Sequence, residues 1–138
     1  MLGLIEKSLS LRREVYAHRL KSSGEEHVDT IREAICFCYA LRDSRDFINA
    51  KELMCKTLPV ARRVLGNTHE YTLRTEELYA LALYKADGAT LDDLHEAVTT
   101  LEETERTARR VMGGAHPITT GIEVSLRNAR RALVRKHL

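Results

Sequence analysis

The sequence predicts an all-α protein in which antiparallel helical hairpins stack into an α-α superhelix. Three observations lead to this prediction. A G-x-x-H-x-x-T pattern occurs at residues 24–30, 66–72 and 113–119, and its successive histidines are 42 and 47 residues apart. Apolar residues between these copies recur at spacings of three and four, as in a helix. No segment alternates between apolar and polar residues as a half-buried strand would.

Six antiparallel helices joined by short loops are expected. They are placed at about 4–21, 27–42, 46–64, 69–86, 90–112 and 116–137. The first has a single apolar stripe, formed by Ile5, Leu9, Tyr16 and Leu20. The second and fourth are apolar nearly all round, over 34–41 and 78–84, which indicates helices packed on both sides.

The other three helices show one-sided patterns. The third carries apolar residues at Ala50, Leu53, Met54, Leu58, Ala61 and Leu65, and the fifth carries them at Leu91, Leu94, Val98, Leu101, Ala108 and Met112. The sixth has its apolar stripe at Ile118, Ile122, Leu126, Ala129 and Leu133 and basic residues elsewhere. Each repeat glycine suits the position after a helix, and Pro117 suits the first turn of the last one.

Composition is that of one folded domain. The chain has 138 residues, of which 43% are hydrophobic and 30% charged, which excludes intrinsic disorder. No apolar run approaches the roughly 20 residues that a membrane span needs, so no membrane partner is expected.

Charge is distributed unevenly although the formal net charge is only +2. Residues 87–105 hold seven acidic side chains and no Lys or Arg, whereas residues 124–138 hold five basic side chains and no acidic one. A basic terminal helix of this kind is more often a solvated face or the complement of an acidic neighbour than a nucleic-acid site. We therefore expect no nucleic-acid partner.

Cysteine usage indicates a reducing compartment. Cys36, Cys38 and Cys55 stand among apolar neighbours and lack the spacing of a disulfide framework or a zinc site. The prediction is that all three are reduced and buried, in a cytoplasmic protein.

The common catalytic and metal-binding patterns are missing from the sequence. It contains no G-x-S-x-G, P-loop, G-x-G-x-x-G or H-E-x-x-H pattern. The three repeat histidines are expected at successive turns, too far apart to share an ion, and Asp92 with His95 lacks further ligands. We expect no enzyme, no metal and no cofactor.

The G-x-x-H-x-x-T pattern between the expected helices resembles that of tetratricopeptide repeats of the kinesin light chain type. The likeness covers residues 24–126 and includes a small residue in the first helix of a pair (Cys38, Ala80) and an alanine in the second (Ala50, Ala97). It implies a superhelix of helix pairs with a concave groove. The expected organisation is one domain over 1–138, with an N-terminal half-repeat or cap at 1–23, a repeat at 24–65, a repeat with an insertion at 66–112 and a C-terminal capping helix at 113–138.

In this repeat type, positions −6, −3, +1 and +4 from the small residue line the concave surface. The charged, amide and tyrosine side chains expected on this arc and beside it are Arg32, Tyr39, Arg42, Arg74, Glu77, Tyr84, Lys85, Asn128 and Arg131. Basic residues predominate, with tyrosines between them. Such a surface suits an extended segment that offers carboxylates and an anchoring side chain.

The sequence therefore leaves two hypotheses for the function. The first is a scaffold or adaptor module that binds an extended, acidic peptide from a partner protein in the concave groove. The second is self-assembly into homo-oligomers, in which the acidic helix at 92–105 of one chain stacks on the basic helix after Val124 of another.

Overall fold

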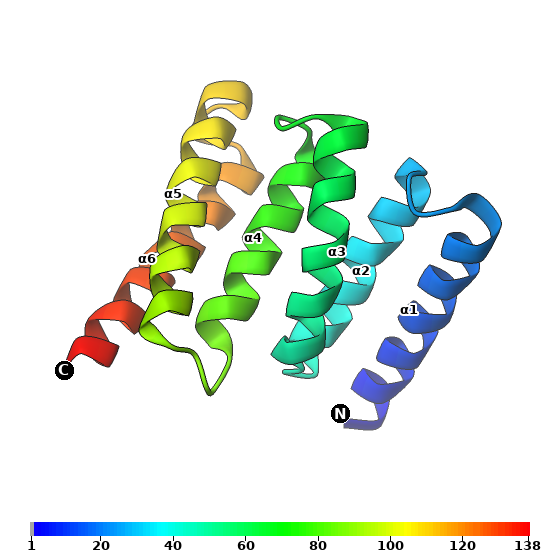
Figure 1. Ribbon diagram of the computed structural model, residues 1–138, viewed down its shortest axis with the longest axis horizontal. Helices are drawn as coiled ribbons and strands as arrows, with labels where there is room; N and C mark the ends of the chain where they lie inside the picture. Colours follow the sequence, from blue (N-terminus) through cyan, green and yellow to red (C-terminus); the bar gives the residue numbers. More distant parts are fainter. Residues whose placement is uncertain (1) are drawn as a thin grey trace.

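The computed structural model describes residues 2–138, and all the regular structure in that range is helical. The helices are α1 (Leu2–Ser23), α2 (Val28–Asp43), α3 (Phe47–Leu65), α4 (Glu70–Lys85), α5 (Leu91–Met112) and α6 (Pro117–His137) (Figure 1). Their number agrees with the prediction, and their ends lie within about two residues of the expected ones.

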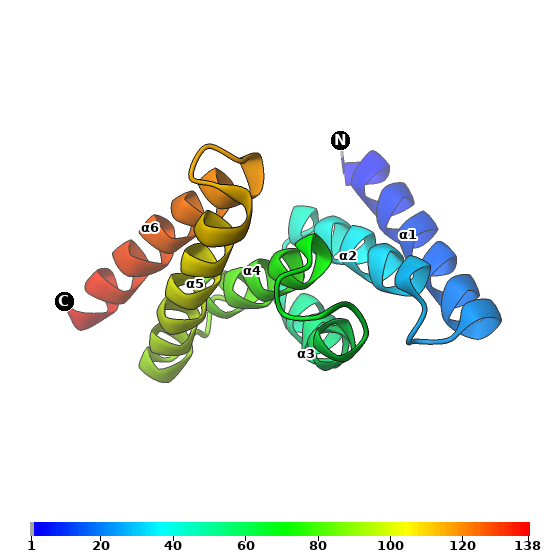
Figure 2. The same ribbon diagram turned by 90° about the horizontal axis from the view of Figure 1, so that it is seen from above.

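Each helix packs against the next one in the chain, and α4 also contacts both α2 and α6. Seen from above, α2, α4 and α6 form one layer, while α3 and α5 lie on its other side (Figure 2). The row of helices is curved in this view, with α1 at one end and α6 at the other (Figure 2). The predicted all-α superhelix of helical hairpins is confirmed.

The repeat glycines end three helices. Gly24, Gly66 and Gly113 adopt φ angles of 85°, 88° and 91°, which residues with a side chain seldom adopt. The amide of each donates a hydrogen bond to the carbonyl four residues earlier, at 3.0 to 3.1 Å. A Cβ added at any of the three positions would meet open space, so the backbone conformation, and not crowding, requires glycine.

The repeat histidines begin three helices. His27, His69 and His116 are the N-cap residues of α2, α4 and α6, and each Nδ1 accepts a hydrogen bond from the amide two residues later, at 3.0 to 3.1 Å. The first helical amides otherwise lack partners, so this contact stabilises the helix start. The expectation that these histidines serve the turns between helices agrees with this geometry.

The repeat threonines are buried beneath the same turns. Thr72 donates its hydroxyl to the carbonyls of Gly66, at 2.8 Å, and Ala61, at 3.3 Å. Thr30 makes the equivalent contact with the carbonyl of Arg19, at 3.4 Å. Both threonines therefore tie the start of one helix to the end of the helix before it.

Removal of one histidine cap is expected to have a measurable cost. The His69→Ala variant should lose about 0.5–2 kcal/mol of unfolding free energy, because the amide of Tyr71 loses its acceptor. The His69→Asn variant keeps an acceptor and should lose less. Urea unfolding of both variants measures the difference. Equal losses would instead assign the effect to the contact between the rings of His69 and Tyr71, whose centroids are 5.1 Å apart.

The core has two parts that share α4. The first joins α2 and α3 to Leu78 and Ala82 of α4. The second joins α5 and α6 to Leu73, Ala80 and Leu83 of α4. The small residues expected at the helix crossings, Cys38, Ala50, Ala80 and Ala97, are all at most 1% exposed. They let the paired helices approach closely.

The two end helices are less buried. In α1 no residue is fully buried, although Leu9 and Tyr16 of its expected stripe pack against the first core. The expected stripe of α6 is buried except for Leu133, which is partly buried against the second core. Among the described helices, each end helix therefore packs on one side only.

The cysteine prediction was partly wrong. All three thiols are free, but only Cys38 is buried, Cys36 is half-buried and Cys55 is exposed. The buried positions of α3 include Leu53, Met54, Thr57 and Leu58, and Cys55 falls on the opposite side of the helix. Burial raises the pKa of the Cys38 thiol to about 12, which keeps it protonated and unreactive.

Candidate functional site

The nine predicted site residues all lie on α2, α4 and α6, the helices of one layer. Tyr84 is buried, Lys85 and Arg131 are exposed, and the other six are half-buried. Because α2 contacts α4 and α4 contacts α6, these three helices lie side by side, and the side of the array that they form is here called the inner face (Figure 2).

An arginine and tyrosine cluster joins α2 to α4 on the inner face. Arg74 donates a hydrogen bond from a terminal guanidinium nitrogen to the hydroxyl of Tyr39, at 2.9 Å. The guanidinium of Arg42 lies 4.8 Å from the centre of the Tyr39 ring, within the range of a cation–π contact. Tyr39 thus holds two cations next to each other.

Both arginines also have a carboxylate partner at the edge of the face. Arg74 contacts Glu70 one turn earlier, at 3.2 Å, and Arg42 contacts its neighbour Asp43, also at 3.2 Å. The side chains of Glu70 and Asp43 are 47% and 59% exposed. Exposed pairs of this kind are worth at most about 1 kcal/mol, so another carboxylate could replace them at little cost.

A carboxylate joins α4 to α6. Glu77 accepts a hydrogen bond from the hydroxyl of Ser125, at 2.8 Å. Burial raises the pKa of the Glu77 carboxyl, while the Ser125 hydrogen bond and the charges of Arg74 and Arg42 act in the opposite direction. Glu77 therefore supplies the negative charge that opposes the positive charges of Arg42 and Arg74.

The buried phenol of Tyr84 lies near Glu77. Burial raises the pKa of Tyr84, and Ser125 and Asn128 of α6 act in the opposite direction. The phenol therefore stays protonated and keeps an O–H group near α6.

Two of the remaining predicted residues lie away from this cluster. Arg32 pairs with Asp29 at 3.2 Å and with Glu33 at 3.7 Å, near the start of α2. Arg131 lines a hollow on the outer part of α6 together with other arginines. The structure therefore brings Tyr39, Arg42, Arg74, Glu77, Tyr84 and Asn128 together and leaves Arg32 and Arg131 apart.

Sequence reasoning missed two contributors. Ser125 was not predicted as a site residue, yet it connects Glu77 of α4 with α6. Glu70 was also not predicted, although its position four residues before Arg74 is a signal for an ion pair on a helix.

The Glu77 carboxyl gives a test by pH. Its folded pKa is raised above the ordinary value of 4.5, so above that pH the folded chain binds more protons than the unfolded chain, and stability falls as pH rises through this window. Glu77→Gln removes the titration and keeps an acceptor for Ser125. The wild type should therefore lose stability relative to this variant as pH rises above about 4.5 and through the raised pKa of Glu77, as measured by urea unfolding. A constant difference would contradict the raised pKa.

Neither a metal cluster nor a membrane span occurs in the part of the chain that the structure describes. Within residues 2–138, no group of three or more His, Cys, Asp or Glu side chains is placed to hold a metal ion. None of the helices described there is both long and apolar enough to cross a membrane.

Comparison with known proteins identifies no family. No protein-family model matches the chain, and no curated protein matches it significantly. The class of protein is therefore defined by the fold alone, as an all-α array of helical hairpins.

Proposed function

We propose that this chain is a protein-interaction module of the tetratricopeptide type, similar to kinesin light chain repeats. Its inner face would bind an extended, acidic segment of a partner protein, so that the module acts as a scaffold or adaptor. The observation that carries the proposal is the cluster of Tyr39, Arg42 and Arg74 on α2 and α4. The charges of both arginines act on the nearby carboxyl group of Glu77, which in turn accepts a hydrogen bond from Ser125 of α6.

The cluster has the chemistry that an acidic segment requires. Arginine pairs carboxylates with two parallel hydrogen bonds, and the guanidinium groups of Arg42 and Arg74 are held in place by the Tyr39 side chain. Orienting them before binding reduces the entropy lost when a ligand is bound. An incoming carboxylate would displace Asp43 and Glu70, whose exposed pairs are weak.

Specificity would come from both ends of the cluster. Glu77 disfavours a second carboxylate near α6, so the ligand should be acidic where it crosses Arg42 and Arg74 and uncharged or basic beside Ser125. Tyrosine provides a rigid contact surface at low entropic cost, which suits Tyr39 to an apolar anchor in the ligand.

The alternative of self-assembly has less support. The acidic and basic helices already pair within the chain, because Arg130 contacts Glu102 at 2.9 Å. The end helices of two stacked chains would also repel each other. The α1 helix carries five basic and two acidic side chains, and α6 carries five basic side chains and one acidic one. Head-to-tail stacking of α1 on α6 would bring like charges together.

A cytoplasmic location is part of the proposal. It is supported by the three free cysteines, because unpaired thiols persist most readily in a reducing compartment.

A selection experiment tests the proposed function. A phage-displayed library of random peptides, about 12 residues long to span the three helices, is panned on the wild-type chain and on the Arg42→Glu/Arg74→Glu variant, whose folding is checked by circular dichroism. Sequences rich in Asp and Glu should be enriched on the wild type only. Enrichment of the same peptides on both proteins, or no enrichment of acidic peptides, would contradict the proposal.

A further inference from the structure

In the first two hairpins, the second helix covers a face of the first. Counted from the capping histidine, positions +4, +7, +11 and +14 lie on this face. In α2 these are Ile31, Ala34, Cys38 and Leu41, and in α4 they are Leu73, Glu76, Ala80 and Leu83, all of which are buried. In α6 the same positions are Thr120, Glu123, Arg127 and Arg130, and three of them are exposed. Within residues 2–138, the equivalent face of α6 is thus uncovered and charged.

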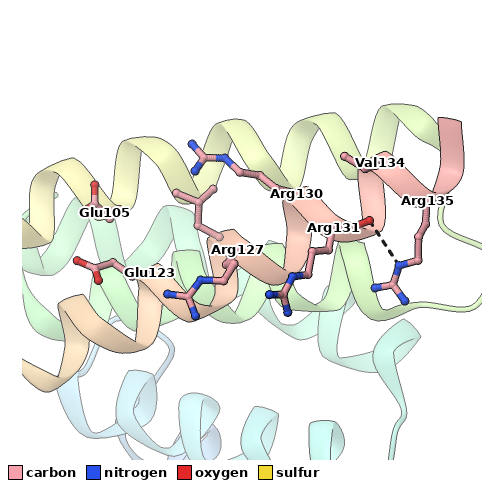
Figure 3. A pocket seen from close by; sticks show the side chains of 8 residues that line it. Glu105, Glu123, Arg127, Arg130, Arg131, Val134 and Arg135 are labelled. Atoms are coloured by element: carbon pink, nitrogen blue, oxygen red, sulfur yellow. Dashed lines mark hydrogen bonds between the residues drawn. The ribbon is translucent and has the colours of Figure 1, made fainter. Parts of the chain in front are cut away.

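A hollow of about 870 Å³ lies over this part of α6 (Figure 3). Its lining is rich in arginine and also includes one leucine, one valine and two carboxylates. The lining residues are Glu105, Glu123, Leu126, Arg127, Arg130, Arg131, Val134 and Arg135. Val134 is 59% exposed. The hollow therefore offers an apolar contact within a cationic border.

Three of its arginines form a stripe without a carboxylate partner in the described residues, although Arg135 donates a hydrogen bond to the backbone carbonyl of Arg131. Arg127, Arg131 and Arg135 are spaced four residues apart, and their side chains point to the same side of α6 (Figure 3). Within residues 2–138, ion pairs of α6 are made by Arg130 with Glu102 and by Glu123 with Arg109, and none by the stripe. Like charges at this spacing destabilise a helix, and only Arg135, in the last turn, gains from the helix dipole.

We infer that the uncovered face of α6 binds an acidic amphipathic helix from a partner protein, in the place that a second helix takes in the other hairpins. Glutamates four residues apart on that helix would pair with the stripe of Arg127, Arg131 and Arg135. Apolar side chains beside them would cover Val134. Because Arg127 stands where Cys38 and Ala80 stand in α2 and α4, charge pairing would replace the close helix contact made there.

The lining favours a protein over a nucleic acid. Glu105 and Glu123 border the hollow, where both contact Arg109, and they make this edge of the hollow less favourable for a phosphate backbone. A helix can place its own basic or polar residues against these carboxylates, whereas a nucleic acid presents negative charge throughout. The surface is also distinct from the Tyr39 cluster, so the two binding events can fail separately.

The test is a selection on a helical library. Phage-displayed helices of about 18 residues, with Glu, Gln or Lys varied at surface positions of an alanine-rich frame, are panned on the wild-type chain. Sequences with Glu at four-residue spacing should be enriched. Their affinity should fall at least tenfold in the Arg127→Gln/Arg135→Gln variant and change less than twofold in the Arg42→Glu/Arg74→Glu variant. The matched Arg106→Gln/Arg110→Gln variant, with the same charge change and exposed arginines four residues apart on α5, should also bind normally.

Several results would overturn this inference. They are the absence of acidic helices among the enriched clones, equal affinity for the Arg127→Gln/Arg135→Gln variant, and undiminished binding of a selected peptide after a central proline prevents its helix. Tighter binding of a DNA duplex of about 20 base pairs through the same two arginines would assign the face to nucleic acid instead.

Loss of folding is separated from loss of binding by thermal unfolding. Arg106, Arg110, Arg127 and Arg135 are all exposed, so the two glutamine variants should melt within a few degrees of the wild type. A variant that melts normally and binds weakly has lost the binding contact itself.

Discussion

Replacing both Arg42 and Arg74 by glutamate is expected to weaken the binding of selected acidic peptides at least 100-fold. The change removes two charge-assisted hydrogen-bond partners, each worth about 1.5–3 kcal/mol, and adds repulsion between like charges. A 100-fold loss corresponds to about 2.7 kcal/mol, below the sum of these effects. Fluorescence anisotropy of a labelled peptide measures it.

The matched control carries the same charge change elsewhere. Arg106 and Arg110 are exposed on α5, which lies in the other layer, and the Arg106→Glu/Arg110→Glu variant should bind within about threefold of the wild type (Figure 2). Wild-type affinity should also fall as salt is raised, because exposed charges are screened. Similar losses in both variants would show that only net charge matters and would contradict a specific site on the inner face.

Truncating Leu101 to alanine is expected to lower the free energy of unfolding by about 2–5 kcal/mol. Leu101 is 0% exposed and belongs to the second core, so the change removes buried methyl groups and leaves a cavity. Domains of this size are stable by only about 5–15 kcal/mol, so the loss is a large share of the total. Urea unfolding measures it.

The Val111→Ala variant is the control on the same helix. Val111 is 47% exposed, and its truncation should change stability by less than about 0.5 kcal/mol. Because each helix contacts mainly its neighbours, the Leu101→Ala change should also speed amide exchange in α5 and α6 more than in α2. Uniform acceleration along the chain would contradict two separate cores joined by α4.

Most of the fold could be predicted because each helix boundary is marked by residue types that have few other roles there. A glycine with positive φ ends a helix, a histidine caps the next, and a threonine binds back to the previous helix. The repeat makes each of these signals visible several times. The exposure of Cys55 could not be predicted in the same way, since it depends on which face of α3 meets its neighbours.

The helices that carry the residues of the candidate site could be predicted, but the contacts between those residues could not. Repeat register placed all nine residues on three adjacent helices, as expected. It could not show that Arg74 contacts Tyr39 across helices or that Ser125 binds Glu77, since residues 35 and 48 positions apart meet only when separate helices pack against each other. It also could not separate Arg131 from the inner cluster, because positions on one helical arc can face different neighbours.

The measurement that tests the proposed function most directly is NMR mapping of a bound acidic peptide on the isotope-labelled chain. We predict that the largest amide shifts cluster on the inner face, at Tyr39, Arg42, Arg74, Glu77 and Ser125. We also predict that the bound peptide shows the backbone couplings of an extended chain. Shifts concentrated on the exposed sides of α3 and α5, or a helical peptide bound at the Tyr39 cluster, would contradict the proposed function.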